Sequence, residues 1–270
     1  MALDTETLAL VRAHEPDRYL AALAAPAEVR DDLLALAAFA AEVRRVPKLA
    51  RDPLVGEIRL TWWREAIEAL ANGARTGNPI ADALAPALAR GAFSAPRLTG
   101  FLDALAFDLS PVAFVDAEAR AIYLGKTEGA LFRLGLARLG LGDPPDALIG
   151  LASRAYGLAR AALDLQGPAP LVTAADLAAT GTRLADLSLP EGEQAREAIA
   201  GHFRAEISEM QTVLRPQLAA VAAEHRPALL PLVMAPSYAG WAMRGSTPPS
   251  APLRRVWRIW RAHRTGRLGD

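Results

Sequence analysis

Residues 17–70 read DRYLAALAAPAEVRDDLLALAAFAAEVRRVPKLARDPLVGEIRLTWWREAIEAL, and this stretch decides the fold class. Its apolar residues recur at the three- and four-residue spacing of a helix face, and they do not alternate as they would in a strand. Prolines at positions 26, 47 and 53 interrupt the pattern, because proline ends or starts helices. The stretch therefore predicts three helices, over 17–23, 27–46 and 54–71.

The rest of the chain continues in the same way, with helical periodicity between short turns. We expect one all-α domain, since no repeat or low-complexity linker divides the chain. The main part covers residues 1–252, and residues 253–270 form a basic amphipathic tail after a proline-rich helix stop at 247–252. The further predicted helices cover 80–89, 96–109, 116–139, 147–165, 174–180, 191–218, 219–225, 228–243 and 253–263.

The composition sets limits on function. The 270 residues are 52% apolar but only 6% aromatic, and alanine and leucine fill most apolar positions, which favours packed helices. Lysine plus arginine and aspartate plus glutamate both number 30, so no overall field attracts nucleic acid and none is expected as a partner. The chain has no cysteine, which excludes disulfides, thiolate metal sites and thiol catalysis.

The beginning of the chain has no basic region followed by a long apolar run, so we expect no signal peptide. No stretch of about 18 apolar residues without charge or proline occurs, so we expect no transmembrane helix. Together with the basic tail, these features predict a cytoplasmic protein that lies peripheral to the inner membrane.

Three segments resemble the squalene/phytoene synthase family. Residues 17–70 are similar to its opening helices, 103–139 to its middle helices and 152–181 to the region of its second aspartate-rich motif. The likeness runs over roughly residues 17–265 and implies the isoprenoid-synthase-type all-α bundle. Enzymes of this family join two prenyl diphosphates head to head. They hold the diphosphates with Mg²⁺ bridged by two DxxxD motifs on facing helices.

Both metal-binding motifs are degenerate here. The first should lie at Glu42 to Val46, where residues i and i+4 share a helix face, but only Glu42 is an acid. In the second, Asp164 is the one acid, with Arg160 a turn before it and Pro168 a turn after it, and neither replaces a carboxylate as a ligand of Mg²⁺. The resemblance therefore implies no metal site, no cofactor and no catalytic residue. Mg²⁺ is expected only if the chain is an active enzyme.

A degenerate substrate site is still expected between the helices, because small residues line the faces that surround prenyl tails in the family. They predict a long, largely apolar cavity between the helices 27–46, 54–71, 116–139 and 147–165, lined by Ala38, Ala41, Gly125, Gly129 and Gly157.

Three cations lie near the first motif, Arg44, Arg45 and Lys48. They could bind a diphosphate or lipid headgroup without metal, or they could be surface charges at a helix C-terminus. The charges around position 59 could likewise pair with neighbouring helices. The candidate site residues are Glu42, Arg45, Arg59, Tyr123 and Asp164.

The tail, residues 253–264, interleaves apolar and aromatic residues with five arginines. On a helix its apolar residues gather on one side, and tryptophan together with arginine is typical of a helix that lies at a membrane surface. The alternative is a terminal helix whose tryptophans dock on the bundle. The candidate membrane-binding residues are Arg254, Arg255, Trp257, Arg258, Trp260 and Arg261.

Within the family, the chain is most similar to the branch related to the mitochondrial complex I assembly factor. The shared stretches are GEIRLTWWREAIEAL (56–70), YLGKTEGALF (123–132) and LRRVWRIW (253–260). This resemblance implies a non-catalytic isoprenoid- or lipid-binding factor that aids assembly of respiratory complex I, with complex I subunits as partners. The alternative is an active prenyltransferase that condenses prenyl diphosphates. A third reading is a structural protein that acts at a membrane surface through the tail alone.

Overall fold

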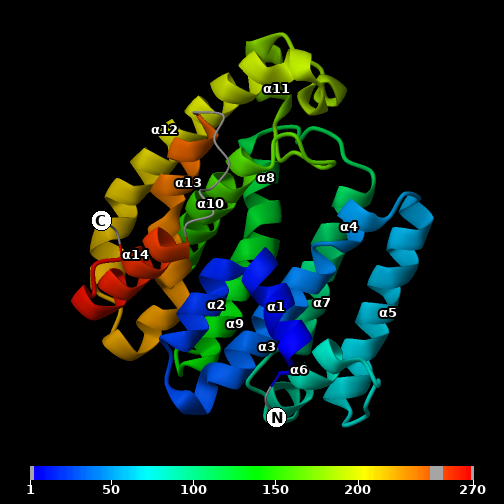
Figure 1. Cartoon of the computed structure of the whole chain (residues 1–270), viewed down its shortest axis with the longest axis vertical. Helices are drawn as coiled ribbons and strands as arrows, with labels where there is room; N and C mark the ends of the chain where they lie inside the picture. The colour runs from blue at the N-terminus through cyan, green and yellow to red at the C-terminus, as the bar shows by residue number, and fades with distance from the viewer. Residues whose placement is uncertain (1–2, 244–251, 269–270) are drawn as a thin grey trace.

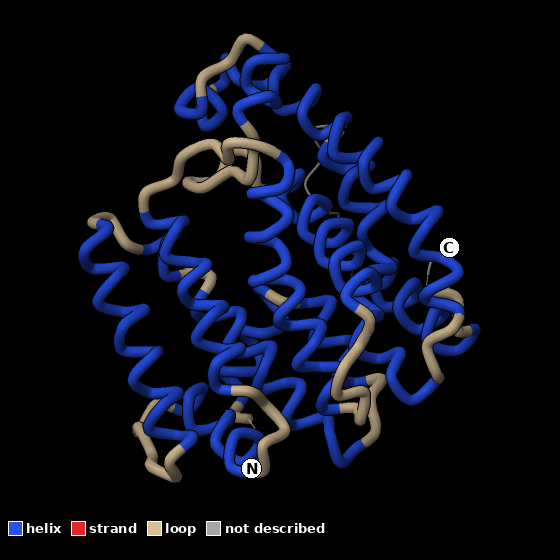
Figure 2. Tube along the Cα trace, turned by 180° about the vertical axis from the view of Figure 1, so that it is seen from behind, coloured by secondary structure: helices blue, strands red, loops and turns tan. Residues whose placement is uncertain are grey.

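The computed structural model describes residues 3–243 and 252–268. Helices make up most of this part of the chain (Figure 2). The described residues contain no strand beyond one isolated bridge between Phe114 and Thr173. The prediction of an all-α, single-domain bundle is confirmed.

The helices and shorter turns follow one another with brief loops between them. In chain order they are α1 (Thr5–His14), α2 (Pro16–Leu23), α3 (Ala27–Val43), α4 (Val46–Leu49), α5 (Pro53–Ala71), α6 (Pro79–Ala89), α7 (Ala95–Leu105), η1 (Ala106–Leu109), α8 (Ala117–Leu124), η2 (Gly125–Gly129), α9 (Ala130–Arg138), α10 (Asp146–Leu163), α11 (Ala174–Thr180), η3 (Leu184–Ser188), η4 (Pro190–Gly192), α12 (Glu193–Ala219), η5 (Ala223–Met234), α13 (Ala235–Ala242) and α14 (Pro252–Thr265). Of the five η segments, η2 is a π-helical turn and the others are 3₁₀ helices.

Helix α10 lies in the middle of the bundle and contacts elements from both halves of the chain (Figure 1). It packs against α12 and α13, which come after it, and against η2 and α8, which come before it. At one edge α5 packs against α6 and α7. At the opposite edge α14 lies on the surface against η5 and α2 (Figure 1).

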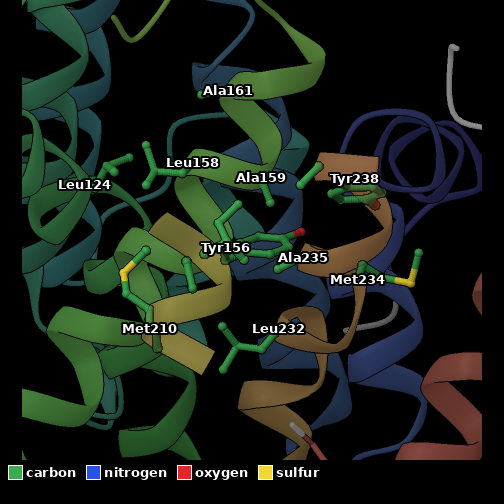
Figure 3. Packing of buried hydrophobic residues seen from close by; sticks show 14 of the residues in the cluster. Leu124, Tyr156, Leu158, Ala159, Ala161, Met210, Leu232, Met234, Ala235 and Tyr238 are labelled. Atoms are coloured by element: carbon green, nitrogen blue, oxygen red, sulfur yellow. The ribbon is translucent and has the colours of Figure 1, made fainter. Parts of the chain in front are cut away.

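The interior is filled mainly by alanine and leucine, with a few large aromatic side chains. Phe39, Phe132 and Tyr156 are almost completely buried, and Figure 3 shows Tyr156 among the apolar neighbours that enclose it. Some helices approach closely because one of them carries glycine. A Cβ atom at Gly157 would lie only 2.4 Å from a methyl group of Leu124, so these two helices could not pack in the same way with alanine there.

Several predicted boundaries were wrong for local reasons. Helix α1 was not predicted, although Asp4 accepts a hydrogen bond from the Thr7 amide in the usual N-cap arrangement. The predicted helix 27–46 ends at Val43 and restarts as the short α4, in whose first turn Pro47 lies. The predicted helix 116–139 is interrupted by η2.

The C-terminal part also differs from prediction. Pro227 and Pro231 lie within η5, so residues 223–234 form a 3₁₀ helix where α-helix was expected. The predicted amphipathic helix at 253–263 is present as α14. Most of the proline-rich stop, residues 247–251, lies outside the described residues. No helix within 3–243 or 252–268 is long and apolar enough to cross a membrane.

Candidate functional site

A cavity of about 350 Å³ opens between α10 and the helices of the N-terminal half. Its wall combines apolar side chains with an unusual number of charged ones. Five segments far apart in sequence form it: the junction of α1 and α2, the end of α3 with α4, the chain from η1 to η2, the second half of α10 with the loop after it, and the pair α13 and α14. The charged and tyrosine side chains on the wall are Asp17, Arg44, Lys48, Asp108, Tyr123, Glu128, Tyr156, Arg160, Asp164, Tyr238 and Arg255.

Two buried glutamates and three arginines form an ion-pair cluster at the cavity wall. Glu128, placed by the π-helical turn η2, accepts hydrogen bonds from Arg44 at 2.8 Å and Arg18 at 2.6 Å. Arg160 donates to Glu15 at 2.7 Å and lies 3.6 Å from Glu128. Each charge therefore has an opposite charge beside it, as buried charges require.

The ion pairs determine the protonation state of the two glutamates. Burial opposes the charged form of Glu128, but the field of Arg44, Arg18 and Arg160 outweighs it and lowers the pKa of Glu128 to about 2. The pKa of Glu15 is also lowered, because Arg160 and Arg44 outweigh the same effect of burial. Both glutamates are thus negatively charged at neutral pH, and the cluster is held as ions.

A second polar group joins α2, α10, α13 and α14 around Asp17. The hydroxyls of Tyr156 and Tyr238 donate to Asp17 Oδ2 at 2.8 and 2.5 Å. Arg255 Nε lies 2.9 Å from Oδ1 of the same carboxylate. Burial is the dominant effect and raises the pKa of Asp17 above its ordinary value, in spite of these partners.

The third polar group faces the cavity from η1 and α8. The hydroxyl of Tyr123 donates to Asp108 Oδ2 at 2.7 Å. Burial raises the pKa of Asp108 to about 6, and the nearby charges of Arg44 and Lys48 oppose that shift. At the rim, Lys48 Nζ and Asp164 Oδ2 form an ion pair at 2.5 Å between side chains that are half exposed.

The structure brings together only two of the five predicted substrate-site residues. Tyr123 and Asp164 line the cavity. Glu42, Arg45 and Arg59 instead line a separate pocket beside Trp62 and Trp63 on the α5 side of α3, where Glu42 and Arg45 pair with each other at 3.0 Å. Their assignment to the central site was wrong.

The physical reason is a register error of two residues in the first motif. Arg44 and Lys48, four residues apart at the end of α3 and in α4, are the pair that lines the cavity, whereas Glu42 and Val46 line the other pocket. Positions two apart on a helix point about 200° apart, so an error of two residues moves a side chain to the opposite face. Of the three cations near the first motif, Arg44 and Lys48 therefore face the cavity and Arg45 does not.

The residues at the cavity rim do not fit Mg²⁺. Two pairs of residues, each spaced i and i+4, lie on facing sides of the rim: Arg44 and Lys48 form one pair, and Arg160 and Asp164 form the other. Only one of these four side chains is a carboxylate. Mg²⁺ needs several oxygen ligands in octahedral geometry. Within the described residues no group of three or more histidine, aspartate or glutamate side chains could hold a metal ion.

The small residues on which the cavity prediction rested do not all line the cavity. Ala38 and Ala41 are completely buried in the packing around α3 and do not line it, and Gly129 is in contact with α10. Helix α5 contributes no lining residue. Gly157, by contrast, does line the cavity. The prediction that the helix now labelled α5 forms one wall of the cavity was wrong.

Sequence analysis missed most of the charged residues of the site. Glu15, Arg18 and Glu128 were not singled out, although all three are charged residues that the fold buries. A buried charge is costly unless a partner is present, so charges at core positions of different helices indicate that they meet.

The all-α bundle with this central cavity is the isoprenoid-synthase fold. It superposes on squalene synthase HpnC from Alicyclobacillus acidocaldarius with a TM-score of 0.71 and 18% sequence identity, over 88% of this chain and 92% of that one. A dehydrosqualene synthase gives a TM-score of 0.71 at 12% identity, over 96% and 94% of the two chains. At these identities the likeness establishes the fold and not the reaction.

The sequence itself identifies the family. Residues 11–241 match the profile described as squalene/phytoene synthase, and the chain belongs to that family. It is also similar to NADH dehydrogenase (ubiquinone) complex I, assembly factor 6, with 26% identity to the Bos taurus protein and 27% to that of Homo sapiens, in each case over 140 residues. That match covers 52% of this chain and 42% of each relative, so it spans less than half of their length.

Proposed function

We propose that this protein is a non-catalytic member of the squalene/phytoene synthase family that holds one isoprenoid or other lipid in its central cavity and aids the assembly of respiratory complex I. The observation that carries the proposal is the replacement of the paired acids by Arg44, Lys48 and Arg160 at the cavity rim. Without the acids, Mg²⁺ cannot bridge a diphosphate to the protein. No cofactor is expected.

The charges of the cavity support a ligand other than a magnesium diphosphate. Arg44 is bound by Glu128, Arg160 by Glu15 and Lys48 by Asp164. An incoming diphosphate would have to break these pairs, which costs several kcal/mol for those that are buried. A lipid with an uncharged polar end leaves them in place.

The size of the cavity supports a single ligand. Its volume of about 350 Å³ is near the lower end of the range of roughly 300–1,000 Å³ that is usual for small-molecule sites. Head-to-head condensation needs two prenyl chains in the same space. The active prenyltransferase is therefore the less favoured alternative.

Similarity to complex I assembly factor 6 supports the role in assembly. The surface of α14 supports work at a membrane, since Trp257 and Trp260 are both more than half exposed among arginines suited to anionic lipid. These two observations together support the proposed place of action, the cytoplasmic face of the inner membrane. They also support complex I subunits as proposed partners.

The test of this role is deletion of the gene in the source organism, followed by native gel electrophoresis of membranes with an in-gel NADH dehydrogenase stain. We expect loss of the full-size complex and accumulation of partial assemblies, with rescue by the wild-type gene. A second rescue with the double variant Glu15→Gln, Arg160→Gln tests whether the cavity cluster is needed. Rescue with Glu42→Gln is the matched control, because Glu42 lies outside the cavity. Normal complex I in the deletion strain would contradict the proposal.

A further inference from the structure

Helix α14 has two opposite faces: one is exposed and the other packs against the bundle. Leu253, Val256, Trp257 and Trp260 follow the i, i+3, i+4, i+7 pattern of a single stripe and are 76%, 42%, 54% and 56% exposed. Ile259 and Ala262 lie on the other side of the helix and are buried. The helix therefore turns more apolar surface outward than it buries against the bundle.

The outward stripe is flanked on one side by positive charge. On a helical projection Arg254, Arg258 and Arg261 lie along one side of the stripe, and all three are exposed. Helix α14 contains no acidic residue. An apolar stripe with arginines along one side and no acid in the helix is complementary to an anionic lipid surface, where apolar groups reach the acyl region and arginines reach the phosphates.

The inward face carries a residue of the cavity wall. Arg255 lines the cavity, and its guanidinium lies 2.9 Å from the Asp17 carboxylate and within hydrogen-bond distance of the Tyr238 hydroxyl at 3.4 Å. The other polar link from α14 to the bundle is a hydrogen bond of 2.6 Å from Arg258 to Ser237. One helix is thus both the membrane-facing surface and part of the wall of the cavity.

We propose that α14 docks on an anionic bilayer and that docking withdraws Arg255 from Asp17, so that the cavity opens toward the membrane for exchange of its lipid. The inference rests on the proposed lipid-binding function and adds its regulation. The arginine side chain can bind a lipid phosphate as well as a carboxylate. Helix α14 is held on the bundle by its buried Ile259 and Ala262, which face η5 and α2, and by the polar contacts of Arg255 and Arg258 described above, which the movement would have to release.

The test uses the natural absence of cysteine in this chain. A single substitution, Ala161→Cys, places one thiol at a buried position of the cavity wall on α10. The rate of its modification by a maleimide is measured without vesicles, with phosphatidylcholine vesicles, and with vesicles that also contain phosphatidylglycerol. The modification rate of the same thiol is then measured with Arg255→Gln, with Arg255→Lys, and with Arg97→Gln, an exposed arginine on α7, as the matched control.

We expect the anionic vesicles to raise the modification rate at least threefold and the neutral vesicles to leave it unchanged. Arg255→Gln should give the raised rate without vesicles, Arg255→Lys should restore most of the slow rate, and Arg97→Gln should behave like the parent protein. Equal rates for Arg255→Gln and the parent, or no response to vesicles that sediment with the protein, would overturn the proposal. Absence of vesicle binding would overturn it too.

Failure of this inference can be told from failure of the proposed function. The thiol assay needs neither a ligand nor complex I, so it reports only on the cavity wall. A protein that carries lipid and supports complex I assembly but shows a constant thiol rate would retain the function and lose the inferred regulation.

Discussion

Arg160 of α10 donates a hydrogen bond to Glu15, just before α2, with 2.7 Å between Nη1 and Oε2. This ion pair joins residues 145 positions apart in the sequence, and Arg160 lies on the cavity wall one helical turn before Asp164. Arg160 supplies no ligand for Mg²⁺ there, and it neutralises a buried carboxylate instead. The charged cluster is thus a structural element of the fold.

The first prediction concerns the cost of breaking this cluster. Glu15→Gln should lower the free energy of unfolding by about 3–5 kcal/mol, because removing one partner of a buried ion pair leaves the other charge uncompensated. Urea denaturation at pH 7 measures it. Glu42→Gln is the control, since Glu42 pairs with Arg45 where both side chains are about one-third exposed, and it should change stability by less than about 1 kcal/mol. Equal effects of the two substitutions would contradict the account.

The second prediction concerns pH. The folded-state pKa of Asp108 is about 6, above its ordinary value of 3.8, so the folded protein binds more protons than the unfolded chain between these values. Its stabilising contribution is complete below pH 3.8 and is lost as the pH rises to about 6. Asp108→Asn should remove this slope and raise the stability at pH 7 by up to about 3 kcal/mol.

The measurement is urea unfolding of the parent and Asp108→Asn at several values from pH 4 to 7. Asp164→Asn serves as the control, because Asp164 is a half-exposed acid on the rim of the same cavity. An unchanged slope in Asp108→Asn would show that Asp108 titrates normally.

The third prediction tests the close packing of α10 against α8. At Gly157 a Cβ atom would lie 2.4 Å from Leu124, which is itself buried, so Gly157→Ala should destabilise the protein by about 1–3 kcal/mol. Gly150 lies in the same helix with nothing within 4 Å of the added atom, and Gly150→Ala should stabilise by up to about 1 kcal/mol. Thermal unfolding of both variants gives the comparison, and the same sign for both would be inconsistent with this packing.

The fourth prediction concerns the outward face of α14. The double substitution Trp257→Ala, Trp260→Ala should reduce binding to anionic vesicles at least tenfold, because more than about 1.4 kcal/mol of apolar burial is lost. Raising the salt concentration should weaken binding of the parent protein, because the charge contribution is screened. Sedimentation with anionic and neutral vesicles measures both effects. Trp62→Ala on α5 is the control, and a similar loss there would argue against a specific surface on α14.

The helices could be predicted from sequence because apolar periodicity, prolines and turn residues act locally. The face of α3 that meets the cavity could not be predicted, since residues 33–41 are all apolar and all buried, so that this part of the helix is apolar on every side. Periodicity then gives no register, and an error of two residues placed Glu42 in the site in place of Arg44.

The ion-pair cluster could not be predicted from the sequence, for a different reason. Glu15, Arg44 and Glu128 come from three segments that meet only through the tertiary fold, and sequence spacing carries no information on such contacts. The π-helical turn that aims Glu128 at Arg44 is likewise set by packing against α10. By contrast, helix α14 itself was predicted from local spacing. Its two faces were not: Ile259 was expected beside Val256 and Trp260 but is buried, and Arg255, a predicted membrane-binding residue, contacts Asp17 on the cavity wall.

The most direct test of the central claim is native mass spectrometry of the purified protein incubated with farnesyl diphosphate and a nicotinamide reductant, once with Mg²⁺ and once with EDTA. The account predicts at most one prenyl ligand per chain, the same occupancy in both conditions, and no condensed product in the extracted lipid. Binding of two prenyl diphosphates that requires Mg²⁺, together with accumulation of squalene over many turnovers, would contradict it.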